Sequence, residues 1–582
     1  STTVHFLDTV RGSDWGADQE VANIFSEEAV VAVRELAHFG VPWTRVRGGK
    51  NKYFIKGENV EIDEALEKDG LITHRDFGGT AKWRACYAAA GTGHSALYAI
   101  DSEVVRLGIS VRDRAEAVAL IHDGTRCVGA VVRDLRDGSH FAVMAKATVI
   151  ATGGYGRIYG QFTSNATINE GTGASIALDT GIVPLGNMEA VQFHPTTVVP
   201  AGILVTEGCR GDGGYLLDKD MKRFMVEAEP EKQELASRDV VSRHMVQRIR
   251  DGYGVESPYG PHLWLDIRHL GEEHLRTKLL EVWDICRDFV GINPAEELIP
   301  VRPTQHYSMG GVRVNKDGQA YGLAGLFAVG EAACWDMHGF NRLGGNSLSE
   351  TIVTGRIVGG RVAEFVAGTE LRADTGVAFD ALAAAEDKAA EWLARSGDGP
   401  SVYDIRDAMG ETMMHKVGIF RTGEELGEAV AEIGQLLEDC DKAVLRCKDP
   451  GVNPELAFAL RLKGMLRLAM TVAKGAQART ESRGAHFRTD FPIRNDRDWL
   501  NRTLVRWGVD DEEPTFSYEP TGIIDLPPGH RGYGSDERVE MSDTLEQHNA
   551  SVLEEQTRHG RLASTEEMGS RLDRGAWKAL SG

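Results

Sequence analysis

The residues best suited to chemistry lie in short segments of the middle of the chain, most of them next to glycine or proline. Together they supply two histidines, three arginines, a threonine and a glutamate. They are His194, Thr206, Glu207, Arg210, Arg238, His306 and Arg342. Arginine binds a carboxylate through parallel N–H groups, and threonine and histidine add further donors. If these side chains converge, the site suits a small dicarboxylate, although each one alone is more often an ordinary core or surface residue.

Two glycine-rich turns follow apolar runs and are candidates for a cofactor site. They are Ala151-Thr152-Gly153-Gly154-Tyr155-Gly156 and Arg342-Leu343-Gly344-Gly345-Asn346-Ser347. Glycine lets the backbone approach a ligand closely, and the start of a helix offers unpaired N–H groups to an anion. A reduced flavin carries negative charge near N1, so a helix start at Ser347 would stabilise it. Each turn alone is equally well explained as a structural turn, but the pair favours a nucleotide or flavin site.

Local patterns predict the elements that carry these turns. Residues 26–38 show helical periodicity that stops at Gly40, and residues 107–150 are rich in strands. Turns are predicted at Asp123-Gly124 and Asp137-Gly138, between those strands. The pattern therefore predicts a mixed α/β region before the first glycine-rich turn.

The strand–turn–helix pattern occurs twice, on either side of a different kind of segment. Buried apolar strands are predicted at 147–151 and 325–330, and a long helix is predicted over 347–366. Between them, from residue 182 to about 302, polar segments and short helices alternate without that pattern. We therefore predict one discontinuous domain with a second domain inserted into it.

Composition excludes several classes of function. The chain has 582 residues and a formal net charge of −22, which disfavours binding to nucleic acid. An anionic substrate would need a site that concentrates positive charge locally. Seven cysteines without a CxxC pair argue against a disulfide framework and against a metal or iron–sulfur site held by this chain, and they favour a reducing compartment. No apolar run approaches the roughly 20 residues of a membrane span, so membrane attachment is predicted to use another protein.

Seven runs occur in order along the sequence and carry a family resemblance from Ser1 to about Trp507. They are HFLDTVRGSDWGADQ, QFHPT, TEGCRGDGG, LASRDVVSR, QHYSMGGV, GEAACWDMHGFNRLGGNSLSE and RTESRGAHFRTDFP. These runs resemble the flavoprotein subunits of fumarate reductase and succinate dehydrogenase, closest to the bacterial menaquinol:fumarate reductase branch. Seven ordered motifs are more specific than a single glycine loop. The resemblance implies an FAD-dependent enzyme that interconverts fumarate and succinate.

The resemblance also implies roles for individual residues. Hydride passes from flavin N5 to one alkene carbon, and Arg238 delivers a proton to the other. Glu207 and Arg210 relay protons to Arg238. The two carboxylates are held by His194, Thr206, His306 and Arg342, of which His194 also counts as catalytic. Residues implied to line the FAD are Thr152, Gly153, Gly154, Glu170, Glu331, Asn346, Ser347 and Leu348. No metal site is expected, and Cys209 resembles a reactive active-site thiol but is equally consistent with an inert packed one.

With this resemblance, the predicted fold is an α/β fold with a discontinuous Rossmann-like FAD-binding domain, an inserted α+β capping domain, a helical domain and a small C-terminal domain. A capping box at Thr422 and Glu425, and an N-cap at Asn453, predict about three helices in the helical domain. The predicted bounds are 1–196 and 304–373 for the FAD-binding domain, 197–303 for the capping domain, 374–490 for the helical domain and 491–582 for the C-terminal domain.

Covalent flavin attachment is usual in the family but its residue is not in this sequence. Family members begin with a strand–GxGxxG–helix unit, and a His-Ser-Ala-Ala-Ala-Gln-Gly-Gly-like segment follows whose His carries the flavin. Neither segment occurs in the sequence given. We therefore predict FAD as the cofactor and name no residue for a covalent link.

The resemblance further implies partners and a location. An iron–sulfur subunit and a haem-bearing membrane cytochrome b subunit would connect this chain to menaquinol or another quinone. The expected location is peripheral, on the cytoplasmic face of the bacterial inner membrane, with the periplasmic face as the alternative.

Two other functions stay open at this stage. A soluble relative, such as L-aspartate oxidase or a soluble fumarate reductase, would use the same fold and arginine cluster. The runs SDWGADQ and RTESRGAHFRTDFP favour the membrane-complex subunits instead. A non-catalytic truncated scaffold is the alternative from another class, and the absence of bound FAD in purified protein would identify it.

Overall fold

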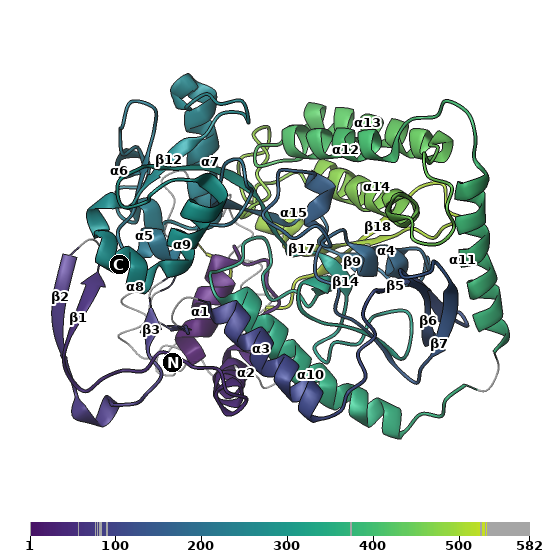
Figure 1. Cartoon of the computed structure of the whole chain (residues 1–582), viewed down its shortest axis with the longest axis horizontal. Helices are drawn as coiled ribbons and strands as arrows, with labels where there is room; N and C mark the ends of the chain where they lie inside the picture. The colour runs from purple at the N-terminus through teal and green to yellow at the C-terminus, as the bar shows by residue number, and fades with distance from the viewer. Residues whose placement is uncertain are drawn as a thin grey trace.

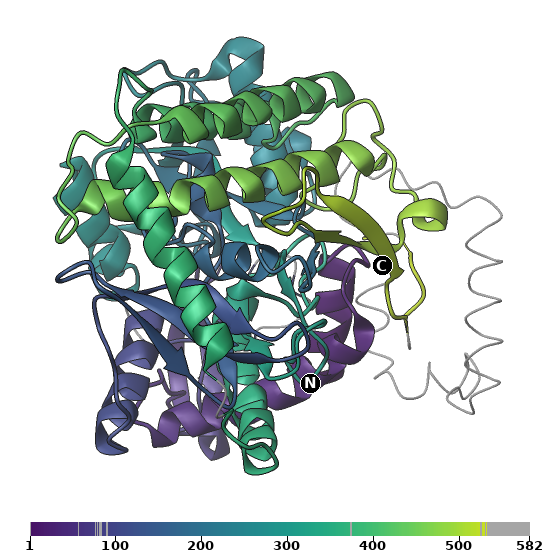
Figure 2. The ribbon, with the colours of Figure 1, turned by 90° about the vertical axis from the view of Figure 1, so that its right-hand side faces the viewer.

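The computed structural model describes residues 2–55, 58–75, 77, 80, 84–88, 91–372, 375–523, 526–529 and 531. Within these residues the chain is a mixed α/β protein, in which small sheets lie among helices from distant parts of the sequence (Figures 1 and 2). No helix in these ranges is both long enough and apolar enough to span a bilayer.

The N-terminal segment is mainly helical and packs against a long helix from much later in the chain. Its helices are α1 (Thr2–Gly12), α2 (Gln19–His38) and α3 (Thr92–Arg106), and its strands are β1 (Gly49–Ile55), β2 (Glu58–Glu64), β3 (His74–Arg75) and β4 (Ala85–Cys86). α2 packs against α10 (Asn346–Ala367), and Figure 1 shows them together. The helix predicted at 26–38 is confirmed, but it begins at Gln19, because the Asp18 carboxylate accepts the N–H groups of Glu20 and Val21.

The strand-rich region forms an antiparallel sheet of three strands followed by a parallel pair. The sheet contains β5 (Ala115–His122), β6 (Cys127–Asp134) and β7 (His140–Met144). Gly124 and Gly138 have positive φ angles in the two connecting turns, as predicted. β8 (Thr148–Ile150) pairs in parallel with β15 (Leu326–Ala328), so the two predicted apolar strands are neighbours. Ile150 in β8 is buried, but Val149 is 42% exposed. This sheet has two strands among the described residues, so the buried strand predicted at 147–151 is only partly buried.

The middle of the chain forms its own sheet and core. The sheet has the order β10-β13-β12-β11, with β10 (Val191–Val198), β11 (Tyr215–Leu217), β12 (Leu263–Asp266) and β13 (Ile299–Ser308). Its helices are α5 (Gly208–Gly211), α6 (Met225–Ala228), α7 (Arg238–Arg248), α8 (Glu272–Lys278) and α9 (Leu280–Ile285). A separate apolar cluster fills the space between them. The boundaries placed at 196/197 and 303/304 fall inside β10 and β13, which pair with each other, so the domain division stays a prediction.

The C-terminal strands join a sheet formed by much earlier residues. The order is β16-β14-β9-β17-β18, with β9 (Leu185–Gly186), β14 (Gly311–Arg313), β16 (Ala333–Cys334), β17 (Asn501–Arg506) and β18 (Thr515–Pro520). β17 pairs with β9, and the short helix α15 (Asp496–Trp499) precedes it. The two strands described after residue 491 therefore extend a sheet of the earlier chain.

The helical region contains four helices where about three were predicted. They are α11 (Gly376–Ala394), α12 (Val402–Lys416), α13 (Gly423–Lys442) and α14 (Pro454–Ala478). Both predicted caps are confirmed. Thr422 Oγ1 accepts the N–H of Glu425 at 3.1 Å, and Asn453 Oδ1 accepts the N–H of Leu456 at 3.0 Å. α14 is buried along most of its length. It packs against α12 and α13, and Figure 1 shows the three helices together.

Candidate active site

Two paired strands bring the predicted histidines together. His194 lies in β10 and His306 in β13, and the register places His194 opposite Thr304. The centroids of the two imidazole rings are 5.0 Å apart. Residues more than 100 positions apart in sequence therefore form one site, as the dicarboxylate hypothesis requires.

The predicted proton donor forms a buried ion pair. Arg238 is the first residue of α7, and Glu207 immediately precedes α5. Arg238 Nε donates to Glu207 Oε2 at 2.9 Å, and the two side chains are 9% and 2% exposed. A charge-assisted hydrogen bond between buried groups fixes geometry well, and here it holds the guanidinium against its predicted relay partner.

Gln192, which the sequence reasoning did not single out, links the two sides of the site. Its Oε1 accepts from Arg238 Nη1 at 3.4 Å, and its Nε2 donates to the carbonyl oxygen of Arg342 at 2.8 Å. Gly344 lets the loop come this close. A Cβ there would lie 3.2 Å from Glu207 Oε2 and 3.3 Å from Arg238 Nη2, so a side chain would press on the ion pair.

A second missed feature anchors the start of α7. The Asp239 carboxylate, next to Arg238, accepts two hydrogen bonds from Arg531, at 2.8 and 3.0 Å. It also accepts from Ser237 Oγ at 2.5 Å and from Arg243 at 3.2 Å. These partners hold the pKa of Asp239 well below its usual range despite burial. The Ser-Arg-Asp sequence was the only local signal, because Arg531 lies 292 residues away.

Burial favours the neutral form of both histidines. Burial, followed by the charges of nearby arginines, lowers the pKa of His194 and of His306 well below the ordinary value. His194 Nδ1 accepts the N–H of Thr196 at 3.2 Å, so its proton lies on Nε2, which is buried without a hydrogen-bond partner among the described residues. His306 Nδ1 lies 2.8 Å from Ser164 Oγ, which orients that ring.

Arg342 and Arg210 supply the remaining positive charge. Arg342 is 5% exposed, and burial together with Arg238 lowers its pKa to about 9. Arg210 donates to the carbonyl oxygen of Glu234 at 2.5 Å. Within the described chain, Arg342 Nε and Arg210 Nε and Nη2 are buried without a hydrogen-bond partner. Buried donors almost always have partners, so these atoms are suited to the oxygens of a bound anion or to water.

Thr206 lies just before α5 and Cys209 lies in it, and their side chains differ in hydrogen bonding and reactivity. Thr206 Oγ1 accepts the N–H of Gly208 at 3.2 Å, which leaves its hydroxyl proton available as a donor. Cys209 is fully buried, and burial raises the pKa of its thiol well above the usual range. A thiol of this kind is unreactive. Of the two interpretations of Cys209, the structure favours the packed thiol.

The predicted cofactor residues gather at one edge of the parallel strand pair. Thr152, Gly153 and Gly154 follow the carboxyl end of β8, and Glu331 follows that of β15. Parallel strands bind ligands at this edge. Glu331 Oε1 accepts the N–H of Ser308 at 2.9 Å, and a Cβ on Gly154 would lie 2.5 Å from the same oxygen.

The start of α10 lies near this edge and has no side-chain cap. Gly345, with φ of 81°, precedes Asn346, Ser347 and Leu348. The Asn346 side chain is already engaged by α1, because its Oδ1 lies 3.0 Å from His5 Nε2 and its Nδ2 donates to Thr9 Oγ1 at 3.2 Å. Asn346 therefore can contact a cofactor through its backbone more readily than through its amide. Both of these α1 partners, His5 and Thr9, lie in the HFLDT run of the sequence.

Glu331 gives an expected pH dependence of stability. Burial raises the pKa of its carboxyl from 4.5 to about 7. Folding then favours the protonated form, so the free energy of unfolding should fall by about 3 kcal/mol as pH rises through that range. Glu331→Gln removes this titration. Urea unfolding at about pH 5 and about pH 7.5 should show the wild type losing stability relative to the variant. The same pH dependence in both proteins would contradict the raised pKa.

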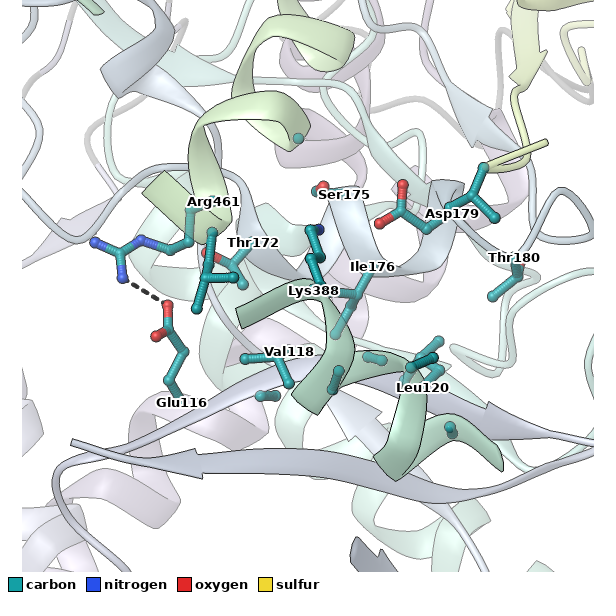
Figure 3. Close-up of a pocket in the computed structure, with 18 of the residues that line it drawn as sticks. Glu116, Val118, Leu120, Thr172, Ser175, Ile176, Asp179, Thr180, Lys388 and Arg461 are labelled. Carbon is teal, nitrogen blue, oxygen red and sulfur yellow. Dashed lines mark hydrogen bonds and ion pairs between the residues drawn. The ribbon is translucent and has the colours of Figure 1, made fainter. Parts of the chain in front are cut away.

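Glu170 lines a pocket of about 360 Å³, and Figure 3 shows this pocket. The pocket is bounded by β5, α4 (Thr172–Leu178), α11 and α14. Arg461 forms ion pairs with both Glu170 and Glu116 there, and the second pair is drawn in Figure 3. The pocket adjoins the first glycine-rich turn, since a Cβ on Gly173 would meet Thr152 Oγ1.

Comparisons with known proteins identify the family of this chain. The family profile described as "FAD binding domain" matches residues 1–348, and "Fumarate reductase flavoprotein C-term" matches residues 406–533. A fumarate reductase flavoprotein subunit of Helicobacter pylori is 47% identical over 94% of this chain and 81% of its own length. One from Mycobacterium tuberculosis is 38% identical over 91% of this chain and 89% of its own length.

A solved structure shows the same fold. The E. coli quinol fumarate reductase chain has a TM-score of 0.84 and 33% sequence identity, and the match covers 92% of this chain and 89% of that one. Fold, site and sequence together define an FAD-dependent oxidoreductase. The chain belongs to the fumarate reductase/succinate dehydrogenase flavoprotein family, of which it is a catalytic flavoprotein subunit.

Proposed function

We propose that this chain interconverts fumarate and succinate and that Arg238 moves the proton. The observation that carries the proposal is the buried Arg238–Glu207 ion pair, at 2.9 Å, in a site with two more arginines and several unpartnered donors. Arg238 is paired with Glu207, while Arg210 and Arg342 keep buried N–H groups that have no partner among the described residues. Such a site favours a dianion over a neutral or cationic molecule.

The dicarboxylate is held by residues from both strands and the loop. Arg342 offers its guanidinium to one carboxylate, and His194 Nε2 has no other partner among the described residues. Thr206 and His306 add donors without introducing negative charge. Hydrogen bonds to the carboxylates stabilise the negative charge that develops on them as the alkene is polarised. These residues therefore bind the substrate and favour the transition state at the same time.

The proton step uses the ion pair directly. FAD, when bound and reduced, would supply the hydride for one alkene carbon. Arg238 donates a proton to the other carbon, so that fumarate gains two electrons and two hydrogens to become succinate. A guanidinium is a weak acid, and donation works because the carbanion-like carbon is strongly basic. Glu207 then returns a proton to Arg238, and we propose that Arg210, three residues after Glu207, in turn supplies Glu207.

The residues present fit FAD at the edge already described. The glycine-rich turn at Gly153, the carboxyl end of β15 and the uncapped start of α10 provide backbone groups and a favourable dipole for an anionic ring or phosphate. We propose that Glu170 and Thr172, in the adjoining pocket, serve another part of the cofactor. In this scheme the segment between β10 and β13 caps the substrate.

The proposed partners are an iron–sulfur subunit and a haem-bearing membrane subunit. The solved relatives include one described as a quinol-fumarate reductase with menaquinol molecules. All seven cysteines of this chain are free thiols, which suits a cytoplasmic, reducing location. These points support the proposal that the chain is attached peripherally at the cytoplasmic face of a bacterial membrane.

An electron-donor assay tests the partner proposal. The flavin gives up two electrons together, as a hydride. The iron–sulfur and haem partners would return electrons to it one at a time. We therefore expect the flavin-loaded chain alone to reduce fumarate with a reduced viologen and to show no activity with a menaquinol. Adding the partner subunits should restore quinol activity. Efficient quinol oxidation by the chain alone would place it with the self-sufficient soluble enzymes. Inactivity with both donors would support the non-catalytic scaffold.

A further inference from the structure

A buried polar cluster lies directly behind Arg342. It consists of Tyr307, His338 and Glu350, which are 3%, 5% and 2% exposed. The Tyr307 hydroxyl donates to Glu350 Oε2 at 2.8 Å, and His338 Nε2 lies 2.8 Å from the same oxygen. None of these three residues has a role in the chemistry proposed above.

The ring of Tyr307 is the surface on which the Arg342 guanidinium rests. The guanidinium carbon lies 4.4 Å from the ring centroid, within the range of a cation–π contact. This contact matters because Arg342 Nε has no hydrogen-bond partner among the described residues. Arg342 also shares a buried site with Arg238, a like charge. The face of an aromatic ring offsets part of that repulsion without using up the N–H groups that a carboxylate needs.

Glu350 ties the ring to the helix at the cofactor edge. Glu350 lies in α10, one turn after the uncapped start at Asn346. Because it accepts the Tyr307 hydroxyl proton, it fixes the ring's orientation and makes the ring more electron-rich, which strengthens its attraction for a cation. Burial and the Glu350 charge raise the pKa of Tyr307 well above the ordinary value, so the phenol stays a donor.

We propose that Tyr307, held by Glu350, is a positioning residue that sets the affinity of Arg342 for the substrate carboxylate. The inference rests on the proposed function, in which Arg342 binds that carboxylate. Tyr307 acts through Arg342 and does not touch the reacting carbons. Its loss should therefore weaken dicarboxylate binding far more than it slows the turnover of bound substrate.

The test compares three variants at the cluster with a control elsewhere. Tyr307→Leu removes the ring, Tyr307→Phe removes only the hydroxyl, and Glu350→Gln removes the charge. Tyr403→Leu is the matched control, because Tyr403 also lies near an arginine, Arg406, at 5.3 Å, but in the helical region. The flavin-loaded proteins are titrated with malonate by the flavin absorbance change, and KM and kcat for fumarate are measured with a reduced viologen.

For Tyr307→Leu we expect the malonate Kd and the fumarate KM to rise roughly tenfold or more, with kcat within about threefold of wild type. Tyr307→Phe and Glu350→Gln should show smaller rises, of about threefold, and Tyr403→Leu none. If Tyr307→Leu fails to hold flavin, the two milder variants decide: a higher malonate Kd supports the inference and an unchanged one overturns it.

Two results would separate this inference from the proposed function. An unchanged malonate Kd in Tyr307→Leu, or a fall in kcat with unchanged KM, would overturn the positioning role and leave the function standing. A wild-type protein that neither binds malonate nor reduces fumarate would instead overturn the proposed function.

Discussion

Arg238→Ala should reduce fumarate turnover by at least about a thousandfold, because a positioned general acid alone contributes 10²–10⁴ and a buried charge is lost as well. FAD should remain bound, since Arg238 pairs with Glu207 and is not among the residues that we propose to hold FAD. The variant leaves Glu207 buried without this partner. Turnover is measured with a reduced viologen, and bound FAD is measured from the visible absorbance of the purified protein.

Arg238→Lys should also be severely impaired. Lysine lacks the planar fork that lets Arg238 reach Glu207 and Gln192 at the same time. The control is Arg250→Ala, an exposed arginine that follows the same helix and should keep wild-type turnover. Near wild-type activity in Arg238→Ala would remove Arg238 from the proton step.

Arg342→Ala should act mainly on binding. The side chain is buried, and we propose that it pairs with one substrate carboxylate, so its loss leaves that carboxylate buried without its counter-charge. Breaking a buried pair costs about 3–5 kcal/mol, which corresponds to at least a hundredfold rise in KM for fumarate. Malonate inhibition should weaken in parallel. Both constants are obtained from viologen-linked assays over a range of fumarate and malonate concentrations.

Substrate charge provides the matching control for Arg342. The wild type should bind dicarboxylates well and monocarboxylates such as crotonate poorly. In Arg342→Ala the difference in affinity between the two classes of ligand should be smaller. Arg356→Ala, which removes a partly exposed arginine of α10 paired with Glu28, should leave both affinities unchanged. Equal affinity of the wild type for crotonate and fumarate would contradict a site built for two carboxylates.

Local features of the fold were predictable because neighbouring residues decide them. The turns at Gly124 and Gly138 need positive φ angles, and the caps at Thr422 and Asn453 satisfy N–H groups three residues away. The α2 start was missed although Asp18 is also a local cap, because the apolar periodicity used to find the helix begins later.

The amino-acid types of the site were also apparent in the sequence, but their arrangement was not. Pairing of β10 with β13 decides that His194 and His306 face one another. The same pairing explains why the domain boundaries could not be placed, since each predicted cut falls in one of the two strands. No pattern within either segment carries information about its partner strand.

By itself the sequence determined the chemical inventory: three arginines, two histidines and a glutamate in glycine-bounded segments, with turns and caps specified by adjacent residues. Only the tertiary structure decided which charges meet. Asp239 pairs with Arg531 across 292 residues, and Arg342 rests on the ring of Tyr307. The physical reason is that a charge buried by folding needs a partner of opposite charge or a hydrogen-bonding group. The packing of distant elements, and not spacing in the sequence, decides which partner lies beside it.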